Sequence, residues 1–186
     1  ITATHRLLEA VRHSTTLKCL VNCSTSSVYG AQATDTEESP PKPTSYYGVT
    51  KLAAEQLALA YHREQALPCC SLRLFSVYGP RERPEKLYPR LIRSILEDQD
   101  FPLFEGSELH SRAFTFVGDV AEAMVAVLDR LDCLPGEIVN IGSDTVITTA
   151  RGIQIVEEIL GKRARLVRRP RRGGDQLHTR ASIDKA

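Results

Sequence analysis

Three side chains in the first third of the sequence are of the types that remove a proton from an alcohol. Thr25 stands in a hydroxyl-rich run, 24–27, and Tyr47 and Lys51 are four residues apart in a segment of helical character. Side chains at this spacing lie on one face of a helix. A free phenol has a pKa of about 10, too high for a base at neutral pH, and a nearby ammonium stabilises the phenolate. With a hydroxyl to hold the alcohol oxygen, the three could take its proton while a hydride leaves to a nicotinamide.

The Tyr47–Lys51 pair has an ordinary alternative explanation. A tyrosine and a lysine four residues apart also occur by chance on the exposed face of an amphipathic helix. The Ser/Thr-rich segment 24–30, which directly follows an apolar run at 18–23, favours the catalytic interpretation. We therefore predict Thr25, Tyr47 and Lys51 as catalytic residues.

The hydrophobic pattern predicts strands that alternate with helices. The expected strands are Lys18–Cys23, Cys69–Phe75, Phe114–Phe116, Glu137–Ile141 and Arg165–Arg168, and the expected helices are Ile1–Arg12, Ser45–Gln65 (with Ser45 as a possible cap), Leu87–Asp98, Val117–Leu131 and Thr149–Leu160. Such alternation is typical of an α/β fold with a parallel sheet, in which ligands bind beyond the carboxyl ends of the strands. The segments 24–43 and 76–86 follow strands, so a site is expected there.

The composition argues against several other classes of protein. The 186 residues carry a formal net charge of +1, so no bulk charge recruits nucleic acid or membrane. No apolar run reaches transmembrane length. The five cysteines are odd in number and form no CxxC pair, which favours reduced thiols and the cytoplasm. The five histidines show no metal-ligand spacing, so we expect no metal site.

Five segments resemble motifs of the extended short-chain dehydrogenases/reductases, in the order in which that family carries them. They are Ser24–Gly30 for S-[ST]-x-x-V-Y-G, Tyr47–Lys51 for Y-G-x-[ST]-K, Cys70–Pro84 for L-R-x-F-N-x-Y-G-P-R, Arg112–Val120 for R-D-F-x-x-V-x-D-[VL] and Arg171–Asp175 for R-R-x-G-D. The sequence thus resembles the NAD-dependent epimerase/dehydratase family, and is similar to its nucleotide-sugar epimerases of the UDP-glucose 4-epimerase kind. The resemblance implies an enzyme with a Rossmann-type parallel sheet, NAD as cofactor and a nucleotide sugar as substrate.

The resemblance also implies roles for the catalytic and cofactor-binding residues. Thr25 would hydrogen-bond the reacting sugar oxygen, and Tyr47 would act as general base and acid. Lys51 would bind the nicotinamide ribose and tune Tyr47, which itself lies against the cofactor. Leu74 and Phe75 would approach the nicotinamide through their backbone.

A second set of residues would bind the substrate. Ser76, Arg112, Arg172 and Asp175 would hold the nucleotide diphosphate, because guanidinium groups fit phosphate oxygens and a carboxylate fits ribose hydroxyls. Thr179, four positions after Asp175, would lie beside the C2 substituent of the sugar. A small residue there leaves room for an acetamido group, so the resemblance predicts that N-acetylhexosamine nucleotides are accepted as well as hexose nucleotides.

The chain departs from the family pattern in three ways. Ser76 stands where asparagine is usual, and Ala113 stands where aspartate is usual. The G-x-x-G-x-x-G loop and the strands around it have no counterpart. We therefore expect a piece of a longer protein, inactive alone, with a partial Rossmann-type sheet. Residues 1–80 would be the C-terminal half of the NAD-binding domain with the catalytic residues. Residues 81–186 would be mainly a small α/β substrate-binding region, from which Glu137–Ile141 returns to the main sheet.

The hydroxyl side chains of Ser26 and Ser27 favour one reaction within the family. The dehydratase branch carries aspartate and glutamate at these two positions, and hydroxyls cannot supply that acid–base step. The expected reaction is therefore epimerisation of a nucleotide sugar, a UDP-hexose at C4, through a 4-keto intermediate. A dehydratase or reductase of the same family remains an alternative, as does a non-catalytic protein that only binds nucleotide sugar or dimerises.

Two further expectations concern partners. The basic segment 162–172 alone could indicate nucleic acid or nuclear import, but no aromatic residues interleave its charges, which favours a solvated strand edge ending in a diphosphate-binding arginine. The resemblance implies a homodimer in which helices 1–12 and 45–65 pair with their copies. Leu52, Leu59 and Ala60 are the candidate contacts.

Overall fold

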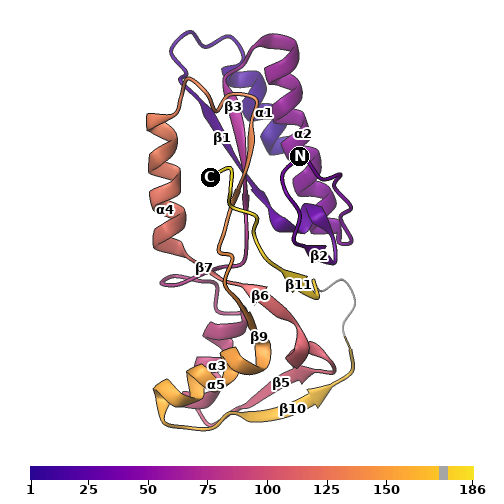
Figure 1. Ribbon diagram of the computed structural model, residues 1–186, viewed down its shortest axis with the longest axis vertical. Helices are drawn as coiled ribbons and strands as arrows, with labels where there is room; N and C mark the ends of the chain where they lie inside the picture. The colour runs from indigo at the N-terminus through magenta and orange to yellow at the C-terminus, as the bar shows by residue number, and fades with distance from the viewer. Residues whose placement is uncertain (172–175) are drawn as a thin grey trace.

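Two regions are stacked along the long axis of the molecule (Figure 1). The computed structural model describes residues 1–171 and 176–186. The upper region in Figure 1 is built on a three-stranded parallel sheet in the order β1–β3–β8, whose strands are β1 (Leu20–Thr25), β3 (Cys69–Leu74) and β8 (Ile138–Ile141). All three run in the same direction. The α/β class with a parallel sheet is confirmed.

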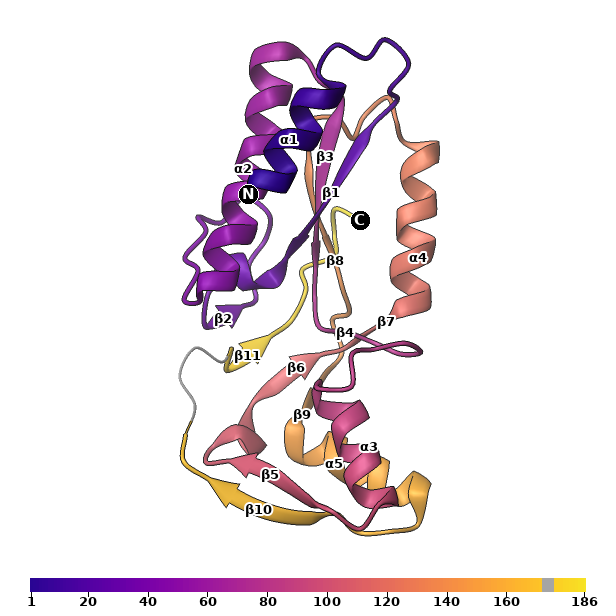
Figure 2. The same cartoon turned by 180° about the vertical axis from the view of Figure 1, so that it is seen from behind.

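Helices cover both faces of this sheet (Figure 2). The helices α1 (Thr2–Val11) and α2 (Tyr46–Gln65) lie on one face, and α4 (Val117–Ala126) lies on the other. Successive residues of a strand point to opposite faces. Accordingly Cys69 packs with the α1 and α2 residues Leu8 and Ala58, whereas Cys70 and its neighbours pack on the side of α4.

The predicted helix at 45–65 forms with the expected cap. The Ser45 hydroxyl accepts a hydrogen bond from the Gly48 amide at 3.0 Å, which satisfies one of the unpaired donors of the first turn. The helix ends at Ala66, whose backbone is left-handed with φ 54°. Because α2 is fixed at both ends, the position of its first turn is well defined.

The lower region contains a second, two-stranded parallel sheet. Its strands are β5 (Asp100–Phe104) and β10 (Arg165–Arg169), and the helices α3 (Leu87–Leu96) and α5 (Thr149–Leu160) lie beside it. The two helices and β5 share a core of Leu91, Ile95, Phe101, Leu103 and Ile153.

A mixed sheet lies where the two regions meet. Its strands follow the order β2 (Gln32–Ala33), β11 (His178–Thr179), β6 (Ser111–Ala113) and β9 (Val146–Thr148). A separate parallel pair consists of β4 (Val77–Tyr78) and β7 (Thr115–Phe116). The β6–β9 pair is antiparallel. Three short 3-10 turns complete the described elements: η1 (Ser26–Tyr29), η2 (Ser107–Leu109) and η3 (Val127–Asp129).

The structure corrects several details of the predicted elements. The strands β2, β4, β5, β6, β9 and β11 were not predicted. The expected helix 117–131 ends at Ala126, where a 3-10 turn follows. Cys69 and Cys70 are buried, whereas Cys23 and Cys133 are exposed, and all five cysteines are free thiols. Within the described ranges, no helix is both long and apolar enough to cross a membrane.

Several cations of the basic segment form ion pairs within the lower region. Its cations pair with carboxylates of neighbouring elements: Lys162 with Asp98 at 2.7 Å, Arg163 with Glu157 at 2.6 Å, Arg165 with Asp100 at 3.0 Å and Arg168 with Glu108 at 2.9 Å. The arrangement agrees with the expected solvated strand edge.

Candidate active site

The first part of the candidate site is the turn that follows β1. Thr25 ends the strand, is 7% exposed, and caps η1 by accepting a hydrogen bond from the Ser27 amide at 3.2 Å. Its hydroxyl donates to the Ser27 hydroxyl at 3.3 Å, a long distance for such a bond. Gly30 closes the turn with φ 91°, and a Cβ there would lie 2.3 Å from the Lys42 carbonyl oxygen. Only glycine fits this backbone.

The first turn of α2 lies directly against this turn. A Cβ on Gly48 would lie 2.7 Å from the Ser27 carbonyl oxygen, so glycine permits the close approach. Tyr47 precedes it and is 57% exposed, and Lys51 donates a hydrogen bond to the Cys23 carbonyl of β1. The structure thus brings Tyr47 and Lys51 to the carboxyl end of β1, where Thr25 lies. In the part of the chain that the structure describes, no hydrogen bond joins the Tyr47 hydroxyl to Thr25 or Lys51.

The residues after β3 lie at the same end of the sheet. Phe75 is fully buried and donates its amide proton to the Ile141 carbonyl at 3.0 Å, while its ring lies 6.2 Å from that of Tyr29. The backbone carbonyl of Ser76 accepts a hydrogen bond from the Thr115 amide at 3.1 Å. The predicted cofactor-contacting backbone of Leu74 and Phe75 is therefore held in a fixed conformation.

Gln176, which the sequence did not indicate, connects the predicted substrate residues to the turn. Its side-chain amide donates to the backbone carbonyl oxygens of Ser26 at 3.2 Å and Gly30 at 2.9 Å. Its backbone carbonyl accepts a hydrogen bond from the Arg112 guanidinium at 3.0 Å. A lone glutamine in a loop has no spacing pattern, so no sequence signal could have identified it.

The remaining predicted substrate residues are placed only in part. Thr179 pairs in register with Ala33 on one side and Arg112 on the other, so the structure brings Thr179 and Arg112 together. Thr179 is fully buried, and its hydroxyl has no partner among the described residues. Arg172 and Asp175 lie outside the described residues.

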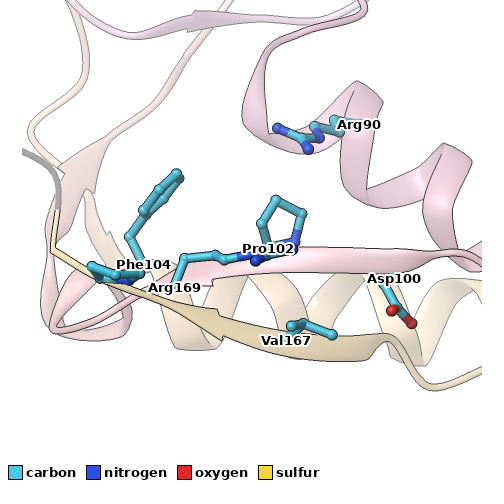
Figure 3. Close-up of a pocket in the computed structure, with 7 residues that line it drawn as sticks. Arg90, Asp100, Pro102, Phe104, Val167 and Arg169 are labelled. Atoms are coloured by element: carbon cyan, nitrogen blue, oxygen red, sulfur yellow. The ribbon is translucent and has the colours of Figure 1, made fainter.

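A cavity of about 430 Å³ lies on the lower region, against the β5–β10 pair (Figure 3). Its apolar lining is formed by Pro102, Phe104, Val167 and Pro170. Two cations, Arg90 of α3 and Arg169 of β10, also line it, together with the carboxylate of Asp100, which pairs with Arg165. A flat ring with a phosphate attached would find both apolar surface and positive charge there. Sequence reasoning missed this cavity because β5 was not predicted.

The sequence matches the NAD dependent epimerase/dehydratase family over residues 1–142. The chain belongs to this family. Membership confirms the resemblance of the sequence to this family.

Individual members of the family are similar over most or all of the chain. UDP-glucuronic acid 4-epimerase from Bacillus cereus, solved with UDP-glucuronic acid and NAD, has a TM-score of 0.94 and 38% identity, covering 100% of this chain and 59% of that one. The uncharacterized UDP-glucose epimerase YtcB of Bacillus subtilis (strain 168) is 38% identical, covering 100% of this chain and 58% of its own length. Human dTDP-D-glucose 4,6-dehydratase is 34% identical over 159 residues, which cover 84% of this chain and 43% of that enzyme. The chain thus spans less than two thirds of these relatives.

Proposed function

We propose that this chain carries the acid–base and substrate-binding part of an NAD-dependent nucleotide-sugar 4-epimerase. The observation that carries the proposal is the placement of an exposed Tyr47 beside the Thr25 turn, with Lys51 bonded to the end of β1. Tyr47 would take the proton of the sugar C4 hydroxyl while Thr25 holds that oxygen. After the 4-keto sugar has turned over, Tyr47 would return the proton. Nicotinamide, when bound, would accept the hydride and give it back to the other face.

The residues around the turn fit such a cofactor. Lys51 is a half-buried ammonium at the carboxyl end of β1, where it can reach ribose hydroxyls, and it can stabilise a neighbouring phenolate. The backbone of Leu74 and Phe75 ends the neighbouring strand. We therefore assign Tyr47, Lys51, Leu74 and Phe75 to cofactor binding. Within this set, Lys51 would orient the ribose of the nicotinamide.

The nucleotide half of the substrate would occupy the cavity on the lower region. Phe104 and Pro102 offer apolar surface for the base, and Arg90 and Arg169 offer charge for phosphate. Arg112, held through Gln176 to the turn, would bind the diphosphate between base and sugar. In this proposal residues 1–80 supply acid–base chemistry, and residues 81–186 mainly supply substrate binding.

Epimerisation is favoured over dehydration by the two residues after Thr25. Loss of water needs a general acid and a base besides Tyr47, and Ser26 and Ser27 offer only hydroxyls. Ser26 is buried, and its carbonyl already accepts from Gln176. The B. cereus relative acts on a uronic acid, so both a UDP-hexose and a UDP-hexuronic acid are candidate substrates.

The test is an NMR assay of the full-length protein with NAD and either UDP-glucose or UDP-glucuronic acid. We expect the C4 epimer to accumulate and its rate to fall by about 10²-fold or more in Tyr47→Phe, since one proton-transfer group is lost. Binding of the nucleotide sugar, followed by calorimetry, should change little.

Tyr46→Phe is the matched control, because Tyr46 is its neighbour on α2, is 94% exposed, and should not affect the rate. A 4-keto-6-deoxy product would instead establish a dehydratase. Turnover that survives Tyr47→Phe would remove Tyr47 from the mechanism.

A further inference from the structure

A charged network is buried between the sheet and α2, behind the candidate site. Arg73 of β3 is 1% exposed and Glu55 of α2 is 0% exposed. The guanidinium makes two hydrogen bonds to the carboxylate, Nε to Oε2 at 3.0 Å and Nη2 to Oε1 at 2.7 Å. This two-point contact fixes the orientation of both side chains, because a planar fork meets a planar carboxylate.

The network continues from Arg73 to the turn that carries Thr25. Arg73 Nη1 donates to the Tyr29 hydroxyl at 2.8 Å and to the Glu37 carbonyl at 3.3 Å. The Tyr29 hydroxyl in turn donates to Asn140 Oδ1 of β8 at 2.9 Å. Tyr29 is the last residue of η1, so a single guanidinium joins α2, the turn and the 35–37 segment.

Packing alone does not require this network. At the other end of the same helix–sheet interface, Leu8, Ala58, Leu67 and Cys69 make an ordinary apolar core. Burying an ion pair costs desolvation that apolar side chains of similar volume avoid, so such a pair is weak evidence for stability. What a network of this kind can supply is one defined geometry.

The geometry that it defines includes both halves of the proposed site. Tyr47, Lys51 and Glu55 are spaced by four residues, so they form one stripe along α2. Glu55 lies about 12 Å along the helix from Tyr47. A rotation of α2 about its axis would therefore move Glu55 and the Tyr47 hydroxyl together. On the other side of the network, Tyr29 is four residues after Thr25, so a bond to Tyr29 restrains the turn that carries Thr25.

We propose that Arg73 and Tyr29 are positioning residues of the epimerase, which set the orientation of Tyr47 relative to Thr25. Arg73 does this by binding Glu55 on the helix and Tyr29 on the turn at the same time. Tyr29 completes the link because its hydroxyl both accepts from Arg73 and donates to β8. This proposal rests on the proposed function for its effect on turnover, but the mechanical link is independent of it.

Tyr29→Phe is the clean test, since it removes the connecting hydroxyl and keeps the ring. In the full-length protein we expect kcat to fall by about 10- to 100-fold, because misplacement of about 1 Å has effects of this size. KM for the nucleotide sugar should stay within about twofold, since the groups that bind substrate are untouched. Hydrogen exchange should accelerate at the amides of 26–30 and 46–51.

Tyr61→Phe is the matched control. Tyr61 is also a buried tyrosine, and its hydroxyl bonds to Glu9 on α1 instead of to the turn. It should leave kcat and the exchange of both segments unchanged. A Tyr29→Phe protein with the kcat of wild type, or with the same loss as Tyr61→Phe, would overturn the proposal.

The exchange experiment also separates this proposal from the proposed function. If the wild-type protein turns over no nucleotide sugar, the proposed function fails and exchange alone decides. Faster exchange at both segments in Tyr29→Phe, and not in Tyr61→Phe, would then uphold the link. Unchanged exchange would refute it.

Discussion

Thr179 is a buried hydroxyl residue beside a predicted phosphate-binding arginine. It is fully buried, its register partner on β6 is Arg112, and its hydroxyl has no partner among the described residues. An unpaired buried hydroxyl costs free energy unless a ligand pairs with it. The contact of Thr179 with the C2 substituent of a sugar stays a prediction of the family resemblance.

Substitution at Thr179 tests that assignment. Thr179→Tyr should lower kcat/KM for UDP-N-acetylglucosamine more than for UDP-glucose, because an aromatic ring fills the space an acetamido group needs. Thr179→Val keeps the shape, so it should leave UDP-glucose turnover nearly unchanged and act as the packing control. Steady-state kinetics on both substrates give the ratio. A ratio that is the same in wild type and Thr179→Tyr would show that Thr179 does not gate the C2 pocket.

Sequence patterns point more readily to candidate reacting residues than to the residues that would support them. The prediction of Thr25, Tyr47 and Lys51 rests on residue types at a fixed spacing, and the structure brings the three to the same end of β1. Arg73 carried a weaker signal, since a charge inside an apolar strand must find a partner, but its partner Glu55 is 18 positions away on another element. The positions of Arg172 and Asp175 stay predictions.

At the scale of elements, α3 and α5 meet at an unusually close contact. A Cβ on Gly152 of α5 would lie 2.3 Å from the Tyr88 hydroxyl oxygen and 3.1 Å from two ring carbons. That hydroxyl is buried without a partner among the described residues. Burial raises the pKa of Tyr88 to about 12. The phenol therefore stays neutral at ordinary pH and occupies the space that glycine leaves.

Gly152→Ala should destabilise the protein even though alanine is the better helix former by about 1 kcal/mol. The clash should outweigh that gain and leave a net loss of about 1–3 kcal/mol. In the Tyr88→Phe background, where the clashing oxygen is gone, most of the loss should be recovered. Denaturant unfolding of the wild type, Gly152→Ala, Tyr88→Phe and the double variant measures how far the two substitutions interact in the free energy of unfolding. Equal losses in both backgrounds would show that the hydroxyl contact is not the cause.

The strands that sequence reasoning missed are only two or three residues long, except β5, which carries a proline. The strand β5 has Pro102 at its centre, and its partner β10 is more than sixty positions away, so nothing in the local pattern indicated it. The short strands β9 and β11 form only within the mixed sheet between the regions. By contrast, α2 was predicted with its cap because Ser45 and the helical pattern are local.

At the scale of the whole molecule, the outer surface of α1 and α2 is where a second copy should bind. Leu59 is only 5% exposed, so it lies in the core of its own chain, which corrects its choice as a contact. Leu7 at 53% and Val49 at 51% are the exposed aliphatic residues on these helices and are the better candidates. We predict a dimer through this surface at micromolar concentration by light scattering of the full-length protein.

Leu7→Lys should shift that dimer toward monomer, because a charge would be desolvated at the interface. Ile159→Lys is the control: Ile159 is 77% exposed on α5, far from the predicted surface in sequence and on another element. A monomeric wild type would refute the prediction. A dimer that survives Leu7→Lys but dissociates in Ile159→Lys would refute it as well.

The bond between Gln176 and the Gly30 carbonyl has a consequence for synthesis of the protein. Its two residues are 146 positions apart, and β11, beside Gln176, joins β2 to β6. A ribosome adds about 5–20 residues per second, so the turn at residue 30 waits on the order of ten seconds for its partner. Until residue 176 leaves the exit tunnel, the carbonyl groups of Ser26 and Gly30 lack this partner. A chaperone that shields the unfinished surface has that interval in which to act.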